Sequence, residues 1–244
     1  MGNNESNLIN SIGKAYREKY PKFEIKENFI CSICNKNKVP IELQKPTINI
    51  CRDCYEIKKE QEYKSMIEYL KDKKVLNDIS EIIPNKLYLG NYYSATLKES
   101  LKEKGITHIL MTGYYLNEIY PNDFTYMTIE IDDDEHEDIF KYFYSCINLI
   151  EKSNIVYVHC QAGMSRSASF VIAYVMFHFK YKLKEAFDYV QERREIICPN
   201  EGFMMQLKDL EKVLEYCNYD FEKYRQINNK IYQPQNDEEK KNKE

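Results

Sequence analysis

The chain has 244 residues, of which 43% are hydrophobic, enough for one domain with a buried core and a small additional module. A net charge of −4 and a pI of about 5.8 argue against general binding to nucleic acid. No apolar run approaches the length of a transmembrane helix. Eight cysteines without a visible secretory signal predict a reducing compartment, with metal binding or catalysis in place of disulfides.

The N-terminal segment, residues 1–30, begins with a candidate lipidation signal. Its first six residues, Met-Gly-Asn-Asn-Glu-Ser, match the N-myristoylation pattern, with Gly2 exposed after Met removal and Ser6 four positions later. One acyl chain gives only marginal, reversible membrane binding. We therefore expect a cytoplasmic protein that is partly membrane-associated through Gly2; the alternative is an ordinary disordered N-terminus.

Four cysteines form two Cys-x2-Cys pairs, Cys31 with Cys34 and Cys51 with Cys54. This spacing predicts a closed structural Zn²⁺ site in a module over residues 31–54. Because such a site has no open coordination position, its role would be folding or binding of a protein partner. A redox pair and a fortuitous cluster are the alternatives. Apolar residues between the pairs predict a short hairpin: Val39, Ile41, Ile48 and Ile50.

After the cysteines, the pattern changes twice. Residues 55–78 are highly charged with apolar residues at helical spacing, which predicts an amphipathic helical linker. From residue 79 to 218, short apolar runs alternate with helical patterns. We expect strands over 86–90, 106–111, 124–131 and 155–158, and helices over 97–104, 140–150, 168–179 and 201–216.

This alternation predicts an α/β fold with a parallel-rich central sheet covered by helices on both faces. Ligands in such folds lie at the carboxyl ends of the strands. The last residues, 219–244, are polar and charged, and we expect them to form a disordered tail.

The strand predicted over 155–158 leads into a short loop and then a helix, an arrangement that presents free backbone N–H groups to an anion. The field at the helix N-terminus favours thiolate, so we expect Cys160 to be a nucleophile. Arg166 can make a two-pronged contact with phosphate oxygens. Ser167 can donate its hydroxyl near the sulfur and help it leave. The alternative is a buried, inert cysteine.

A run of acidic residues, Asp132-Asp133-Asp134-Glu135-His136-Glu137-Asp138, follows the third predicted strand. Cleavage of a phosphate ester requires a proton on the leaving oxygen, and a carboxylic acid opposite the sulfur could supply it. The alternative is a solvated acidic loop that caps the next helix. We assign no role to His136.

The segment His159-Cys160-Gln161-Ala162-Gly163-Met164-Ser165-Arg166-Ser167 resembles the signature loop of the dual-specificity protein phosphatases. Other segments match in the right order: Leu87-Tyr88-Leu89-Gly90, Tyr93-Ser94-Ala95, residues 105–110, Arg193-Arg194, Pro199-Asn200, Phe203, Gln206 and Leu207. The resemblance covers residues 79–217. It implies the cysteine-phosphatase fold and hydrolysis of phosphotyrosine and phosphoserine or phosphothreonine through a cysteinyl-phosphate, without a catalytic cofactor.

The resemblance also implies roles for single residues. The family's general acid lies five residues before an Asp-Ile pair, here Asp138-Ile139, which indicates Asp133, with Asp132 and Asp134 as alternatives. His159 would be a buried, hydrogen-bonded support that helps to lower the thiol pKa. Asn200 would support the loop from behind, or else be a plain turn residue. The substrate phosphate would bind to Arg166 and to the loop residues Gln161, Ala162, Gly163, Met164 and Ser165.

Relatives that act on inositol lipids place lysines inside this loop, and none is present here, which favours phosphoprotein substrates. The acidic pI disfavours an RNA phosphatase. The alternative functions are a non-catalytic phosphate-binding scaffold and a phosphatase of a non-protein ester. We expect the remaining cysteines to be small buried hydrophobic residues: Cys146, Cys198 and Cys217.

Overall fold

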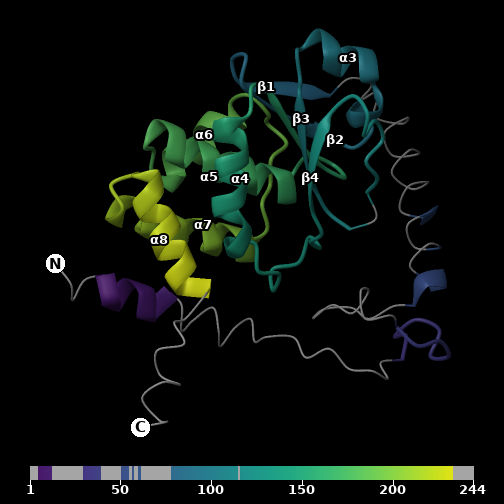
Figure 1. Ribbon diagram of the computed structural model, residues 1–244, viewed down its shortest axis with the longest axis horizontal. Helices are drawn as coiled ribbons and strands as arrows, with labels where there is room; N and C mark the ends of the chain where they lie inside the picture. Colours follow the sequence, from purple (N-terminus) through teal and green to yellow (C-terminus); the bar gives the residue numbers. More distant parts are fainter. Residues whose placement is uncertain are drawn as a thin grey trace.

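The computed structural model of the chain describes residues 5–12, 30–39, 51–54, 57, 60–61, 78–114 and 116–232 (Figure 1). Gly2 lies outside these residues. So do most of the hairpin predicted after Val39 and most of the helical linker predicted before Asp78.

A five-stranded sheet with the order β1-β2-β5-β3-β4 forms the centre of the domain. Its strands are β1 (Ile79–Ile83), β2 (Leu87–Asn91), β3 (His108–Thr112), β4 (Thr125–Ile129) and β5 (Val156–Cys160). All neighbours are parallel except β1, which pairs antiparallel with β2. Every residue of β2 and β5 is buried, as expected for central parallel strands. The predicted parallel-rich sheet is confirmed.

The edge strand β1 was not predicted from the sequence. It is joined to β2 by a tight turn in which Asn85 has a φ of 53°, a left-handed conformation that asparagine tolerates. Lys86 closes the turn by donating its backbone N–H to the carbonyl of Ile83. The strand is short and half polar, so its pattern does not stand out from that of a loop.

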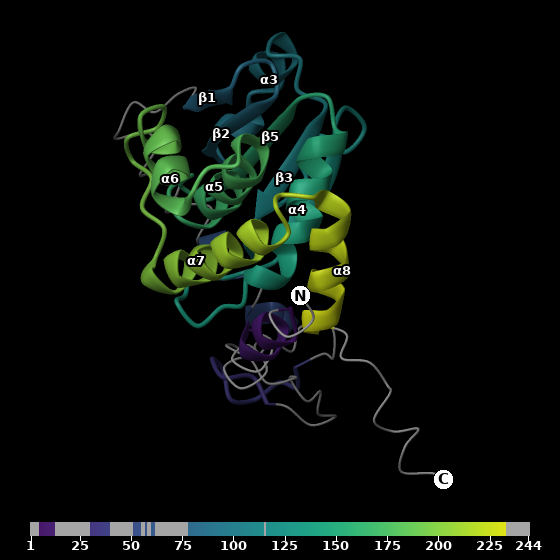
Figure 2. The ribbon, with the colours of Figure 1, turned by 90° about the vertical axis from the view of Figure 1, so that its left-hand side faces the viewer.

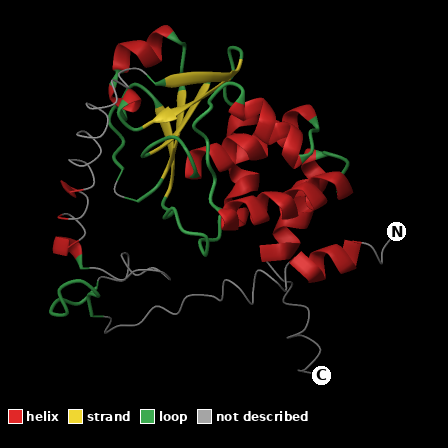
Figure 3. Ribbon diagram, turned by 180° about the vertical axis from the view of Figure 1, so that it is seen from behind, coloured by secondary structure: helices red, strands yellow, loops and turns green. Residues whose placement is uncertain are grey.

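Helices cover the two faces of the sheet unequally (Figures 1 and 3). On one side lie α4 (Phe140–Lys152), α5 (Arg166–Phe179), α6 (Leu183–Gln191), α7 (Glu201–Tyr216) and α8 (Phe221–Tyr232). The opposite face is covered by α3 (Lys98–Glu103) and a short 3-10 turn (Ser94–Thr96), which enclose a smaller core around Tyr157. The central helix α5 packs directly on β2, β3 and β5. No helix among the described residues is long and apolar enough to cross a membrane.

Residues 221–232 differ from the prediction of a disordered tail, because they form α8. Tyr224, Ile227 and Ile231 recur at helical spacing and are buried against the main core. Because these few apolar residues are spread among many charged ones, the composition of the segment did not indicate a helix with an apolar face. The helix also contacts the N-terminal helix over residues 5–12, where Lys230 Nζ lies 2.6 Å from a Glu5 carboxylate oxygen (Figure 2).

Candidate active site

Cys160 is the last residue of β5, and Arg166 is the first residue of α5. The segment between them, which we call the Cys160 loop (residues 160–166), therefore lies at the carboxyl end of a central strand flanked by β2 and β3. This is the edge of a parallel sheet where ligands bind. Burial of β5 on both faces and of α5 nearly all round fixes the two ends of the loop.

Five carbonyl groups of the Cys160 loop, those of residues 161–165, accept hydrogen bonds from outside the loop. The Gln161 carbonyl accepts from the Tyr92 N–H and the Met164 carbonyl from the Cys198 N–H, at 3.1 and 2.8 Å. Ala162 and Gly163 accept from Arg194. Ser165 accepts from the backbone and hydroxyl of Ser169 on α5. Because the carbonyls point outward, the N–H groups are available to an anion at the centre.

The sulfur of Cys160 lies at that centre. It accepts hydrogen bonds from the Gly163 N–H and the Ser167 hydroxyl, each at 3.2 Å. Burial opposes ionisation of this thiol, but the charge of Arg166 and the hydrogen bonds from Ser167 and Gly163 lower the pKa of Cys160 below its ordinary value. A thiolate is the nucleophilic form of cysteine, so the geometry suits chemistry at sulfur.

The guanidinium of Arg166 lies beside the sulfur with donor capacity to spare. Its Nε is buried and has no hydrogen-bond partner among the described residues, and it lies 3.7 Å from Asp133 Oδ2. Nη1 donates to the Ile131 carbonyl at 3.5 Å. A Cβ at Gly113, the residue after β3, would lie 2.6 Å from Nη1, so a side chain there would displace the guanidinium from this position. The fork is thus positioned for an oxyanion.

Of the three consecutive aspartates, Asp133 is the one directed at the Cys160 loop. Its Oδ1 accepts from the Ser165 hydroxyl at 2.6 Å and from Asn200 Nδ2 at 3.0 Å. Asp134 Oδ1 instead accepts from the backbone N–H of the exposed His136 at 2.7 Å, and the backbone N–H of Asp132 donates to Glu137 Oε2 at 3.4 Å. The register taken from the resemblance and the orientation in the structure agree on Asp133.

The acidic loop (residues 132–138) is only partly solvated. Glu137 and Asp138 are buried, and burial raises the pKa of both carboxyls. Asp138 accepts from the Lys141 N–H at the start of α4, the capping contact that the acidic run suggested. Gln206 accepts from the N–H groups of Ile139 and Phe140 and donates to the Glu137 carbonyl, which fastens the end of the loop to α7.

His159 is 1% exposed, and its Nδ1 lies 3.2 Å from the Cys160 carbonyl oxygen. Its ring stacks on Tyr157 at 5.4 Å and packs against Tyr92. Burial lowers the pKa of this histidine to about 4, so the ring is neutral at physiological pH. It can hold the start of the loop, but any effect on the thiol acts through the backbone and not through a positive charge.

Asn200 makes several contacts at once. As the N-cap of α7 it accepts from the Phe203 N–H at 2.9 Å, and its backbone N–H donates to Ser165 Oγ at 3.3 Å. Its amide also donates to Asp133. Asn200 was expected either to support the Cys160 loop or to be a plain turn residue, and its contacts have features of both. It connects α7, the Cys160 loop and the acidic loop.

Three residues at the site were missed or left without a role by the sequence. Arg194 was quoted only as part of the family pattern, although it bonds two loop carbonyls. Gly113 and Asp78 carried no signal at all. One expectation was wrong: Cys198 is exposed, because it lies in the extended segment between α6 and α7, whereas Cys146 and Cys217 are buried as expected.

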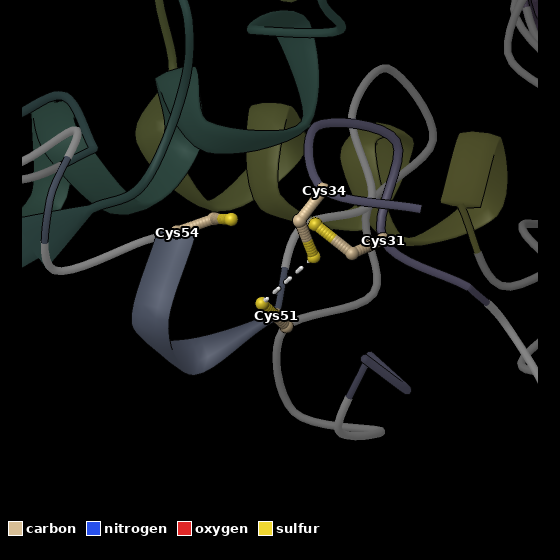
Figure 4. Close-up of side chains that lie close together, drawn as sticks. All are labelled: Cys31, Cys34, Cys51 and Cys54. Carbon is tan, nitrogen blue, oxygen red and sulfur yellow. Dashed lines mark hydrogen bonds between the residues drawn. The ribbon is translucent and has the colours of Figure 1, made fainter. Parts of the chain in front are cut away.

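The four-cysteine group (Cys31, Cys34, Cys51 and Cys54) comes together in the structure (Figure 4). Its sulfur atoms all lie within 4.8 Å of one another, and Cys34 and Cys51 are 3.8 Å apart. A tetrahedral Zn²⁺ with Zn–S bonds of about 2.3 Å separates its sulfurs by about 3.8 Å. Backbone N–H groups lower the pKa of Cys34, and they lower that of Cys31 to about 6 against the effect of burial. The group could bind a metal.

Comparisons with known proteins agree with this geometry. A sequence model of the dual specificity phosphatase catalytic domain matches residues 87–213. Dual specificity protein phosphatase 1 of Arabidopsis thaliana is 32% identical over 173 residues, or 68% of this chain and 87% of that protein. MAP kinase phosphatase with leucine-rich repeats protein 1 of Dictyostelium discoideum is 40% identical over 139 residues, or 56% of this chain and 16% of that protein.

Among solved structures, the human tyrosine phosphatase-like serine/threonine/tyrosine-interacting protein superposes with a TM-score of 0.55. It is 38% identical and covers 57% of this chain and 99% of its own.

The chain belongs to the dual specificity phosphatase family. Its domain is that of a protein-tyrosine/serine/threonine phosphatase, and the predicted enzyme class and fold are confirmed. It spans most of the Arabidopsis relative but less than a fifth of the Dictyostelium one.

Proposed function

We propose that this chain hydrolyses phosphoprotein monoesters at the Cys160 loop in two steps. In the first, the Cys160 thiolate attacks phosphorus and the bond to the ester oxygen breaks. The loop N–H groups and Arg166 hold the charge on the equatorial oxygens. Asp133 gives its proton to the departing oxygen of tyrosine, serine or threonine. The observation that carries this proposal is the position of the Cys160 sulfur, which accepts hydrogen bonds from the Gly163 N–H and the Ser167 hydroxyl and is close enough to the Arg166 charge to be stabilised by it.

In the second step, Asp133 accepts a proton from water as the water oxygen attacks the phosphorus of the cysteinyl-phosphate. The S–P bond breaks, inorganic phosphate leaves, and the sulfur returns to its thiolate form. The Ser167 hydroxyl, which already donates to this sulfur at 3.2 Å, stabilises the developing negative charge. The chain's own residues supply all proton transfers of the cycle.

Removal of the nucleophile is the direct test. With a small aryl phosphate, Cys160→Ser is expected to lower kcat by on the order of 10⁴-fold or more. The matched control is Cys198→Ser, which changes an exposed thiol near the same loop and should keep wild-type turnover. A Cys160→Ser protein that remains active would refute the mechanism. An inactive wild-type chain that still binds vanadate would instead indicate the non-catalytic phosphate-binding function.

The four-cysteine group would hold a structural Zn²⁺ ion. Four sulfurs at about the spacing of a tetrahedral site, with amide donors around two of them, support this assignment. A four-thiolate shell is coordinatively closed, so the ion would stabilise the module or a surface for a protein partner. Metal analysis of reduced, purified protein should find about one zinc ion per chain. Protein without bound metal would contradict the assignment.

A second part of the proposal concerns location. The sequence Met-Gly-Asn-Asn-Glu-Ser supports N-myristoylation of Gly2, and a single acyl chain would give weak, reversible membrane attachment of a cytoplasmic protein. Mass spectrometry of protein from eukaryotic cells should find an N-terminal mass increase that a Gly2→Ala variant lacks. An unmodified N-terminus would reject this part without affecting the catalytic proposal.

A further inference from the structure

A partly buried ion pair links the Cys160 loop to the residue immediately before β1. Arg194 is 3% exposed, and its guanidinium meets the Asp78 carboxylate with two parallel hydrogen bonds, each of 2.5 Å. This bidentate fork is the strongest geometry available to the two groups. Asp78 lies far from the loop in sequence, and no motif marks it.

The same guanidinium holds the loop. Arg194 Nε donates to the Gly163 carbonyl at 2.7 Å, and Nη2 donates to the Ala162 carbonyl at 3.3 Å. Two of the five loop carbonyls that face outward are thus held by one side chain. Because each peptide plane is rigid, fixing a carbonyl outward fixes the N–H of the next residue inward. The bond to Ala162 therefore orients the Gly163 N–H, which donates to Cys160 Sγ at 3.2 Å.

Asp78 is itself held in place. Its Oδ2 accepts from Asn91 Nδ2 at 3.1 Å, and Asn91 stands opposite Cys160 in the parallel register of β2 and β5. Gly90 has no room for a side chain, since a Cβ there would lie 2.4 Å from the Asp78 carbonyl oxygen. A Cβ at Gly163 would likewise meet the Gly90 carbonyl at 2.3 Å. The Asp78–Arg194 pair, strand β2 and the Cys160 loop are therefore packed against one another.

We propose that Asp78 is a positioning residue of the phosphatase site, which acts through Arg194 to hold the loop amides toward the nucleophile and the phosphate. It touches neither substrate nor sulfur. A buried guanidinium without its counter-charge is strongly disfavoured, so loss of the carboxylate would draw Arg194 toward water and away from the loop carbonyls. This inference rests on the proposed function of the Cys160 loop and adds a residue that the family resemblance did not indicate.

Asp78→Asn in the full chain tests the proposal. We expect a loss of about 10- to 100-fold in kcat/KM for an aryl phosphate and a similar loss in vanadate affinity, because a displaced loop misplaces the oxyanion donors. The acid limb of the pH profile should move to higher pH as the Gly163 bond to sulfur weakens. Asp78→Glu, which keeps the charge, should recover part of both losses.

The matched control is Asp123→Asn. The Asp123 side chain is 22% exposed against 20% for Asp78, and it also makes two short ion pairs, to Lys98 and Lys102 on α3. This variant should lower the melting temperature but leave vanadate affinity and the pH profile unchanged. If Asp78→Asn behaves in the same way, Asp78 has only a structural role and the proposal is overturned.

Two further measurements keep the test decisive. If Asp78→Asn does not fold, Arg194→Lys keeps a charge for Asp78 but loses the fork, and it should show the same loss of vanadate affinity. Wild-type affinity in that variant would reject the proposal. If the wild-type chain itself has no turnover, the proposed function fails, while the rate of Cys160 alkylation as a function of pH still reports whether Asp78→Asn disturbs the loop.

Discussion

Cys160 and the four-cysteine group hold sulfur in opposite surroundings. Cys160 stands alone, and an amide, a hydroxyl and one guanidinium favour the ionised form of its thiol. The four N-terminal cysteines stand together, with all sulfurs within 4.8 Å. Several thiolates at that spacing repel one another, so a cation is the natural partner for the group.

A third cysteine environment completes the comparison. Cys146 on α4 is fully buried with no such donors, and burial raises the pKa of its thiol well above the ordinary value. Burial therefore acts against ionisation in every case, and neighbouring donors decide the outcome. For this chain, the surroundings of each cysteine separate the proposed nucleophile, the candidate metal ligands and a buried packing residue, and the following experiments test this comparison.

The largest effect is expected for the proton donor. Asp133→Asn should lower kcat by about 10²- to 10⁴-fold with little change in KM, because an amide cannot protonate the leaving oxygen. Asp134→Asn is the control, since Asp134 bonds only the exposed His136 in the contacts described above. Equal losses in both variants would place the acid elsewhere in the loop.

The next effect concerns stability. The pKa of His159 is lowered to about 4 in the folded chain and is about 6.5 in an unfolded one. As the pH falls from 6.5 to 4, the unfolded chain binds a proton that the folded chain excludes. Stability is therefore lost over this window, by roughly 3 kcal/mol in total, and none is lost through this group above pH 6.5.

Urea unfolding at several pH values measures this loss. A His159→Gln variant should lack that part of the slope, whereas His136→Gln should keep it, because the His136 side chain is 71% exposed. A wild-type curve parallel to that of His159→Gln would mean that the folded chain binds this proton as readily as the unfolded chain. Below about pH 6.5 the ring would then carry a positive charge at the start of the Cys160 loop.

A smaller effect is expected for Ser167→Ala, which removes one donor from the Cys160 sulfur. The pKa of Cys160 should rise, because the hydrogen bond that is lost stabilises the charged form of the sulfur. The acid limb should move to higher pH, and kcat should fall about 10-fold because S–P cleavage slows. Rapid-quench experiments should then find accumulated phosphoenzyme.

Ser169→Ala provides the contrast to that variant. Ser169 is also a buried serine of α5, but its hydroxyl donates to the Ser165 carbonyl and not to sulfur. Its removal should leave the position of the acid limb unchanged. A shift of equal size in both variants would attribute the effect to packing of α5 and remove Ser167 from the mechanism.

How much of the active site could be predicted from the sequence depends on whether its residues are close together in the chain. The strand, loop and helix around Cys160 are contiguous in the chain, so Cys160, Arg166 and Ser167 could be predicted together from one segment. Asp133 needed the family register to choose among three adjacent aspartates. In the structure, Asp133 accepts a hydrogen bond from the Ser165 hydroxyl, a contact that forms only when the chain folds.

Residues that act across the sheet escaped prediction. Asp78 and Gly113 matter because of what chain folding places against them, a guanidinium in each case, and neither position has a local pattern. The helix α8 was hidden for a different reason: its apolar stripe is narrow and its composition resembles that of a tail. Catalytic residues that lie close together in the chain can be predicted from one sequence, whereas contacts between distant segments cannot.

The smallest effect separates the two cysteine environments most cleanly. If the four-cysteine group holds the proposed Zn²⁺ ion, removal of that ion by a chelator should change kcat/KM for an aryl phosphate by less than about 3-fold, because a closed four-thiolate site has no open position for the reaction. Asp78 is the first described residue of the domain. Its side chain accepts hydrogen bonds from Arg194 and Asn91, and Arg194 also donates to Ser80, so these contacts all lie within the domain. Zinc-loaded and metal-free protein should therefore share one pH profile on the small substrate, while protease susceptibility of residues 31–54 should rise on metal loss. A fall in turnover matching that of Asp78→Asn would show that the four-cysteine group acts on the Cys160 loop through this entry point, and the two regions would then have to be treated as one functional unit.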